Sequence, residues 1–250
     1  MMRRGIVLLM CLSGAAMVAH AQGSAKLEVG HFSVAAEGAV LPDGWAPLTF
    51  KKIERHTTYE VVKDGPVSVV KAVSEVSASG LTKAVAIDPH EYPIVRWRWK
   101  VENLLQKGNV NRKDGDDYPA RLYITFAYEP AKVSFGRKLK YQAGRMLFGD
   151  IPIGALNYIW DGKSPVGTVV DNAFTDFAKM IVVESGPQRI GTWVEEERNV
   201  YEDYRLAFGE EPPAISGASC QVGDTAMTTT MPTTDMTADT VNQRGPKRKP

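Results

Sequence analysis

The sequence predicts a mainly β protein: an antiparallel β-sandwich of the jelly-roll or carbohydrate-binding-module kind, with one or two inserted helices. Two observations favour this fold class. At least seven short segments are rich in β-branched and aromatic residues and are separated by turn signals, and several of them alternate between apolar and polar residues. In contrast, just two stretches repeat with a helical period.

A β-hairpin is predicted near the start of the regular pattern. The segments His56–Val62 and Val67–Val73 are rich in β-forming residues and flank the turn signal Asp64–Gly65. The composition of Ser77–Gly80 then indicates a loop or a bulge.

The clearest strand is Tyr92–Val101, because apolar and charged side chains alternate along it. We assign Trp97 and Trp99 to the core rather than to a sugar-stacking surface, because Val95 shares their face. The opposite face presents Ile94, Arg96, Arg98 and Lys100. Trp45 and Trp193 are also expected to be structural.

Further strands are predicted at Arg121–Phe126, Ala155–Trp160, Ala178–Glu184 and Gly191–Glu197. The first helix is expected at Phe135–Phe148, from its apolar spacing. The second is expected at Asn199–Phe208, with Asn199 as its N-cap and Gly209 as its stop.

The N-terminus has the pattern of a secretory signal peptide, residues 1–21. Arg3 and Arg4 precede an apolar run, and Ala19–Ala21 fits a cleavage site. The alternative is a membrane anchor, but the run is shorter than the ~18–20 residues that a span needs. We therefore expect a periplasmic or extracellular protein with no transmembrane segment after cleavage.

Charge and cysteine content argue against a nucleic-acid-binding protein and against a fold held by disulfides. The formal net charge is +1, and cleavage removes Arg3 and Arg4, which leaves +1 − 2 = −1. No strong basic field remains for nucleic acid. Cleavage also removes Cys11, so Cys220 has no partner for a disulfide within the chain.

The polar faces of two predicted strands carry the main candidate ligand site. Arg96, Arg98, Arg121 and Tyr123 would share one side of a sheet if their strands were neighbours, and Trp160 is a further candidate. Guanidinium groups and an aromatic ring suit an anionic or sugar-like ligand. The alternative is a solvated face neutralised by Asp116, Asp117, Glu195 or Glu197.

The turn Asp114–Asp117 has two interpretations. Its clustered carboxylates could hold calcium, but the twelfth position from Asp114 is Thr125 rather than the glutamate of an EF-hand. The favoured alternative is an acidic turn in which one carboxylate caps backbone amides. If the turn takes part in ligand binding, Asp116 and Asp117 would orient the arginines or hold calcium. We expect no other cofactor, since the histidines His31, His56 and His90 are scattered.

Glu195 and Glu197 support a weaker, catalytic alternative. On a strand they would share one face at about 7 Å, which is compatible with the paired carboxylates of glycosidases. Such acidic pairs are also commonplace on exposed strands. The nucleophile motif G-x-S-x-G of serine hydrolases does not occur.

Five stretches together resemble the bacterial exported family DUF3047, a domain of unknown function. They are SASGL (77–81), EYPIVRWRWKV (91–101), KDGDDYPARLYITF (113–126), GDIPIGALNYIW (149–160) and ERNVYEDYRLAFGEEPP (197–213). The resemblance covers about Trp45–Gly217 and implies a secreted β-sandwich similar to carbohydrate-binding modules, without an established reaction. The last stretch adds Arg198 and Asp203 as candidate ligand residues.

After Gly217 the sequence departs from the family pattern. An apolar strand, an Asp-Thr-Asp-Asn-Thr-Gly-like loop and a last strand would be expected, but Gln221–Pro250 is rich in Thr and Met. We therefore predict a single domain over 22–217 and a disordered or diverged tail over 218–250, in which the terminal strands are missing or replaced.

The leading hypothesis is a non-catalytic module that binds a glycan or another polar polymer of the cell envelope. One alternative is a polysaccharide hydrolase with paired carboxylates. The other is a structural envelope protein whose arginines contact a protein partner.

Overall fold

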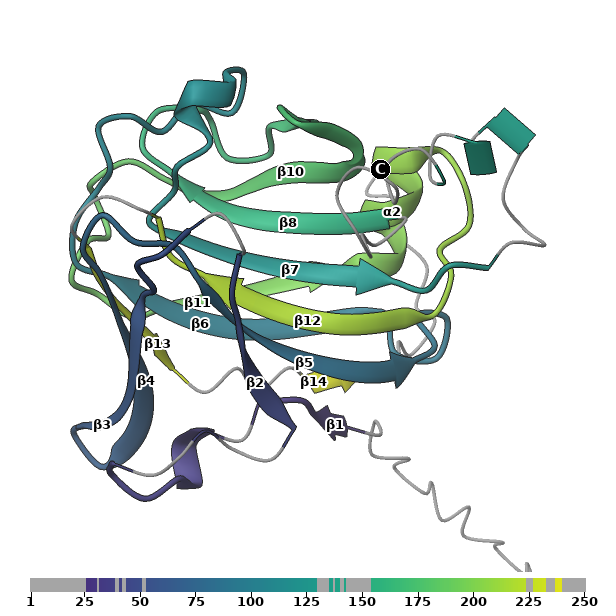
Figure 1. The fold of residues 1–250 in the computed structure, drawn as a ribbon. Helices are drawn as coiled ribbons and strands as arrows, with labels where there is room; N and C mark the ends of the chain where they lie inside the picture. Colours follow the sequence, from purple (N-terminus) through teal and green to yellow (C-terminus); the bar gives the residue numbers. More distant parts are fainter. Residues whose placement is uncertain are drawn as a thin grey trace, which may run out of the picture.

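Two β-sheets of seven strands each pack face to face, and the core lies between them (Figure 1). The computed structural model describes residues 26–30, 32–38, 41, 44–50, 53–129, 135–136, 138–139, 142, 154–223, 227–232 and 237–239. The fold is therefore mainly β with antiparallel sheets, as the sequence predicts. The signal sequence predicted at 1–21 lies outside the described residues.

The first sheet is built around β6 (Ile94–Val101). Its order is β1 (Lys26–Glu28), β14 (Thr237–Asp239), β6, β13 (Met227–Pro232), β4 (Val67–Ser74) and β3 (Thr58–Asp64). The seventh strand, β11 (Val194–Asn199), pairs antiparallel with β6 alone. Thus β11 is an edge strand among the described residues. The predicted hairpin is confirmed as β3 and β4, with Gly65 at a φ of 63° in the turn.

The second sheet lies across the core from the first. Its order is β2 (Trp45–Leu48), β5 (Gly80–Ile87), β12 (Ile215–Gln221), β7 (Ala120–Phe126), β8 (Gly154–Asp161), β10 (Thr175–Ser185) and β9 (Val169–Asn172). All its pairs are antiparallel except β8 with β10, which run parallel.

Aromatic side chains join the two sheets. The Trp97 and Tyr158 ring centroids lie 5.2 Å apart, and those of Trp99 and Trp160 lie 6.2 Å apart. All four rings are buried. The alternation in β6 therefore directs its tryptophans inward and its charged residues outward, and the predicted core role of Trp97 and Trp99 is confirmed.

One α-helix, α2 (Val200–Phe208), packs against β6, β8 and β11. The Asn199 side chain accepts a hydrogen bond from the Glu202 amide, and Gly209 ends the helix at a φ of 71°. Both are as predicted. Two 3-10 turns lie at Phe32–Val34 and Lys113–Gly115.

The other predicted helix, Phe135–Phe148, is described in part. Residues 135–136, 138–139 and 142 are helical, and the remainder lies outside the described residues. In the described part of the chain, no helix is both long and apolar enough to cross a membrane.

The predicted boundary at Gly217 is wrong, because regular structure continues past it. Strand β12 runs through the boundary and pairs with both β5 and β7. Further along, β13 pairs with β4 and β6, and β14 pairs with β1 and β6. Threonine is a good strand former, and backbone pairing needs no alternation of apolar residues. Residues 240–250 lie outside the described residues.

Candidate functional site

The predicted ligand site divides between the two sheets. Arg96 and Arg98 lie on β6 in the first sheet, whereas Arg121 and Tyr123 lie on β7 in the second. Each pair points away from the core, because its apolar strand neighbours point inward. The core separates the two pairs, so the expectation that they share one sheet face is wrong.

Arg121 is buried and held by protein groups. Its Nη1 donates to Asp116 Oδ1 at 3.0 Å, and its Nη2 donates to the Asp116 carbonyl at 2.5 Å. Its guanidinium lies 4.8 Å from the centroid of the Tyr118 ring. Burial alone would lower the pKa of Arg121, but Tyr123 and Asp116 raise it above its ordinary value. Asp116 therefore orients Arg121, as one reading of the acidic turn predicts.

The neighbours of Arg121 on this outer face are also largely enclosed. The Tyr123 hydroxyl accepts a hydrogen bond from Arg121 at 3.4 Å, and burial raises the pKa of Tyr123. Asn157, opposite Tyr123 on β8, is fully buried. These residues brace the second sheet and offer little surface to a ligand.

The other carboxylates of the acidic turn point to different partners. Asp114 pairs with Arg112 at 2.6 Å, while Asp117 is buried. Within the described ranges, no three His, Cys, Asp or Glu side chains are grouped so that they could hold a metal ion.

Arg198 on β11 and Asp203 on α2 form a partly buried ion pair. Arg198 Nε lies 2.9 Å from Asp203 Oδ2, and the Tyr158 hydroxyl donates to the same oxygen at 2.8 Å. This network joins β11, α2 and β8. Trp160 is fully buried in the core, so its predicted place beside the arginines is wrong.

Sequence reasoning missed the most unusual feature of the outer face of the first sheet, the side chain of Trp193. Its half-buried ring lies against two cations: Arg98 Cζ is 5.2 Å and Lys100 Nζ is 5.1 Å from the ring centroid. Its Nε1 donates to Asp64 Oδ2 at 2.9 Å, and Lys100 donates to that oxygen at 2.8 Å. Both bonds lower the pKa of Asp64, and the bond from Lys100 has the larger effect. Together they hold the Trp193 ring in place.

Arg98 and Glu195 stand directly opposite each other on β6 and β11. Neither forms a hydrogen bond or an ion pair with any described residue, although Glu195 is exposed and Arg98 is half-buried. By contrast, the neighbouring Arg96 pairs with Glu197 at 2.7 Å. We call Trp193, Arg98, Lys100, Asp64 and Glu195 the Trp193 platform.

The predicted carboxylate pair Glu195 and Glu197 lies beside this platform. Both side chains are exposed on the outer face, as their spacing on a strand predicts. However, Glu197 is engaged by Arg96, so the two carboxylates have different surroundings.

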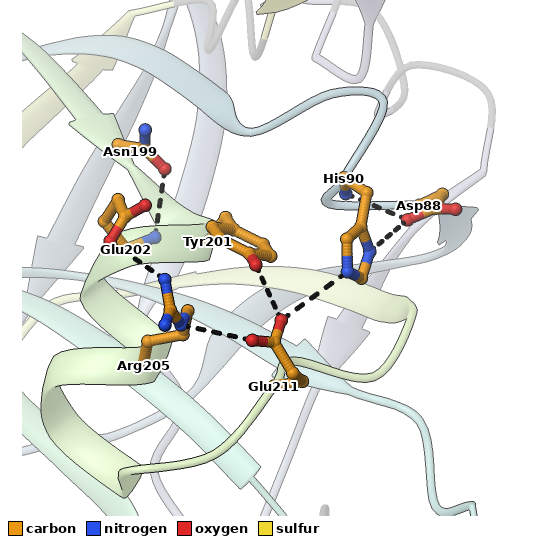
Figure 2. Close-up of polar contacts among 7 residues, drawn as sticks. All are labelled: Asp88, His90, Asn199, Tyr201, Glu202, Arg205 and Glu211. Carbon is orange, nitrogen blue, oxygen red and sulfur yellow. Dashed lines mark hydrogen bonds and ion pairs between the residues drawn. The ribbon is translucent and has the colours of Figure 1, made fainter. Parts of the chain in front are cut away.

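A second polar cluster, at α2, differs because its members satisfy one another (Figure 2). Glu211 Oε2 accepts from the Tyr201 hydroxyl at 2.6 Å and lies 3.6 Å from His90 Nε2, and its Oε1 lies 3.3 Å from Arg205 Nε. His90 Nδ1 is also 2.9 Å from Asp88. This cluster ties the β5–β6 turn to the segment after α2 and leaves few groups for a ligand.

Local sequence could not have identified the Trp193 platform. The alternation of β6 places Arg98 and Lys100 outward, but Trp193 lies more than ninety positions later in the chain. What brings them together is the β6–β11 pairing.

The chain belongs to the family described as "Protein of unknown function (DUF3047)", whose model matches residues 43–236. No match to this sequence is found among curated proteins.

Among solved structures, the chain is similar to the family 11 carbohydrate-binding module of the cellulosomal cellulase Lic26A-Cel5E of Clostridium thermocellum. The identity is 7%, the match covers 87% of this chain and 95% of that one, and the TM-score is 0.40. It is also similar to Trichoderma harzianum endoglucanase 3 from family GH12, with 10% identity, 87% and 98% coverage and a TM-score of 0.38. Both TM-scores are low, so these likenesses decide nothing about a ligand.

Proposed function

We propose that this protein is a non-catalytic binding module, and that its Trp193 platform binds a glycan. The observation that carries the proposal is the pair formed by Arg98 and Glu195. A guanidinium and a carboxylate stand opposite each other beside a fixed indole ring, and neither has a hydrogen-bond partner among the described residues.

Sugar hydroxyls match this pair because each hydroxyl both donates and accepts hydrogen bonds. Glu195 would accept from the ligand, and Arg98 would donate to it through its planar set of N–H groups. The Trp193 ring would pack against the apolar face of a sugar. Lys100 and Asp64 would hold that ring, which lowers the ordering cost of binding.

The charge balance of the surface favours a neutral glycan over a polyanion. The three cations Arg96, Arg98 and Lys100 share this surface with four carboxylates, Asp64, Glu102, Glu195 and Glu197. A dense polyanion would gain the Arg98 contact but would meet the unpaired Glu195 carboxylate.

The cellular setting belongs to the proposal as well. The N-terminal signal pattern supports export, and a polysaccharide of the cell envelope would then be within reach.

A thermal-shift and calorimetric screen tests this function. The mature chain, residues 22–250, is titrated with neutral hexasaccharides (cellohexaose, xylohexaose, mannohexaose) and with an anionic oligogalacturonate. A neutral ligand at 100 times its Kd should stabilise the fold by ~2.7 kcal/mol, which is a shift of a few degrees in Tm. A response to oligogalacturonate alone, or to none of these sugars, would contradict the proposal.

A further inference from the structure

Glu196 lies between the two outward glutamates of β11 but points to the opposite side, toward the core. It stands opposite Trp97 on β6, and its Oε1 is buried with no hydrogen-bond partner among the described residues. A buried, unpartnered carboxylate oxygen is costly when the group is ionised.

Groups from each neighbouring element face Glu196, and they do not neutralise it. β10 contributes Glu184, a like charge, and the following loop contributes Arg189. Arg189 is already bound to Glu184 at 2.7 Å, and Arg198 of β11 is engaged by Asp203.

The balance of these influences favours the neutral acid. Burial and Glu184 raise the pKa of Glu196 to about 7, and the Trp99 indole, Arg189 and Arg198 reverse only part of that rise. Glu196 therefore titrates near neutral pH, where a solvent-exposed glutamate is fully ionised.

The ionised Glu196 carboxylate is stabilised most by hydration, which requires β11 to move away from the second sheet so that water can enter. Among the described residues β11 is an edge strand bonded to β6 on one side, so the part of β11 before Arg198 can make that movement while Arg198 stays bound to Asp203. The same strand carries Glu195 on its outer face and follows directly after Trp193. A shift of β11 would therefore disturb two members of the Trp193 platform.

We propose that proton binding at Glu196 controls the Trp193 platform: the neutral carboxyl seats β11 against the second sheet, and the ionised carboxylate releases it and weakens ligand binding. The binding half of this proposal rests on the proposed function, whereas the movement of β11 stands without it. By linkage, a ligand that needs the seated strand favours the protonated form, so its affinity falls as the pH rises.

Two measurements on the same protein test the two halves. Hydrogen-exchange protection factors of the β11 amides, corrected for intrinsic exchange, are compared at pH 6 and pH 8, with the β7 amides as an internal reference. The Kd for cellohexaose and xylohexaose is measured at the same two values. The variants are Glu196→Gln, Glu184→Gln and, as a control exposed on β3, Glu60→Gln.

In the wild type and in Glu60→Gln, β11 protection should fall severalfold from pH 6 to pH 8, and Kd should rise by up to about tenfold per pH unit, the limit for one proton. Glu196→Gln should keep both quantities constant. Glu184→Gln should move both transitions to lower pH, because it removes the like charge.

Three results would overturn the proposal. They are β11 protection that does not change with pH in the wild type, the same change in Glu196→Gln, and a Kd that stays constant while β11 loosens. If neither sugar binds at either pH, the proposed function fails, and the exchange data still decide whether Glu196 controls β11.

Discussion

Arg98 and Glu195 are directly opposed across β6 and β11, yet the guanidinium lies over the Trp193 ring instead of on the carboxylate. The two choices are close in energy: an exposed cation–π contact contributes ~0.5–1 kcal/mol and an exposed ion pair ~0.2–1 kcal/mol. The ring prevails here because Asp64 fixes it in place. As a result, a cation and an anion stand side by side without neutralising each other.

Arg121 should matter to stability and not to ligand binding. Arg121→Ala removes the partner of Asp116 and the cation over Tyr118, both in a buried setting, and should lower the free energy of unfolding by about 3 kcal/mol. Urea unfolding measures this loss. Arg112→Ala, which breaks an exposed pair in the same turn, is the matched control and should cost less than about 1 kcal/mol. Equal losses would show that Arg121 has no special structural role.

The Tyr158 hydroxyl should stabilise the link between β8 and α2. Tyr158→Phe keeps the ring in the core but removes the hydrogen bond to Asp203, at a cost of ~1.5–3 kcal/mol for a bond to a charged group. Thermal unfolding tests the loss. Tyr201→Phe removes an equally direct but exposed bond to Glu211 and should change stability by a few tenths of a kcal/mol. A larger effect at Tyr201 would contradict this assignment.

Glu196 should make stability fall as the pH rises. Its pKa is about 7 in the folded protein and 4.5 in the unfolded chain, so the folded state binds more protons between these values. Its stabilising contribution is fully present below pH 4.5 and is lost as the pH passes 7. The wild-type free energy of unfolding should therefore decline across this window by roughly 1–2 kcal/mol more than that of Glu196→Gln, allowing for partial exposure. Parallel curves for the two proteins would refute this.

Val76 is a strained position in the turn between β4 and β5. It has a φ of 50°, a conformation that a β-branched residue adopts at a cost of ~1–2 kcal/mol, and its side chain is 72% exposed. Val76→Asn should stabilise the fold by about 1 kcal/mol, because asparagine tolerates this conformation and no packing is lost. Gly65→Val places the same residue type at a φ of 63° and should destabilise it. Chemical denaturation of both variants checks the sign.

Local features of the fold could be predicted from sequence because their physics is local. The alternation along β6, the Asp64–Gly65 turn and the Asn199 cap each depend on neighbours a few residues away. Strand pairing is different, since no local pattern says which sheet a strand joins. This is why Arg98 and Arg121 could be assigned to strands but not to opposite sides of the sandwich.

The same limit explains the errors at the C-terminus and at Trp193. The Thr-rich strand β13 and the three-residue strand β14 have no apolar alternation, and their pairing partners lie far back in the chain. Trp193 differs from other structural tryptophans through two cations that arrive from β6. A family resemblance could supply the fold class but not the positions of these side chains.

The most direct test of the binding account compares two arginines on the same face of β6. Arg98 has no hydrogen-bonding partner in the described part of the chain, whereas Arg96 pairs with Glu197. By isothermal titration calorimetry with the neutral hexasaccharide that binds most tightly, Arg98→Ala and Glu195→Gln should each weaken binding at least about tenfold. Arg96→Ala should leave the affinity within about twofold, and all three variants should keep the wild-type Tm within a few degrees. Wild-type affinity in Arg98→Ala would contradict the claim that the Trp193 platform is the binding site.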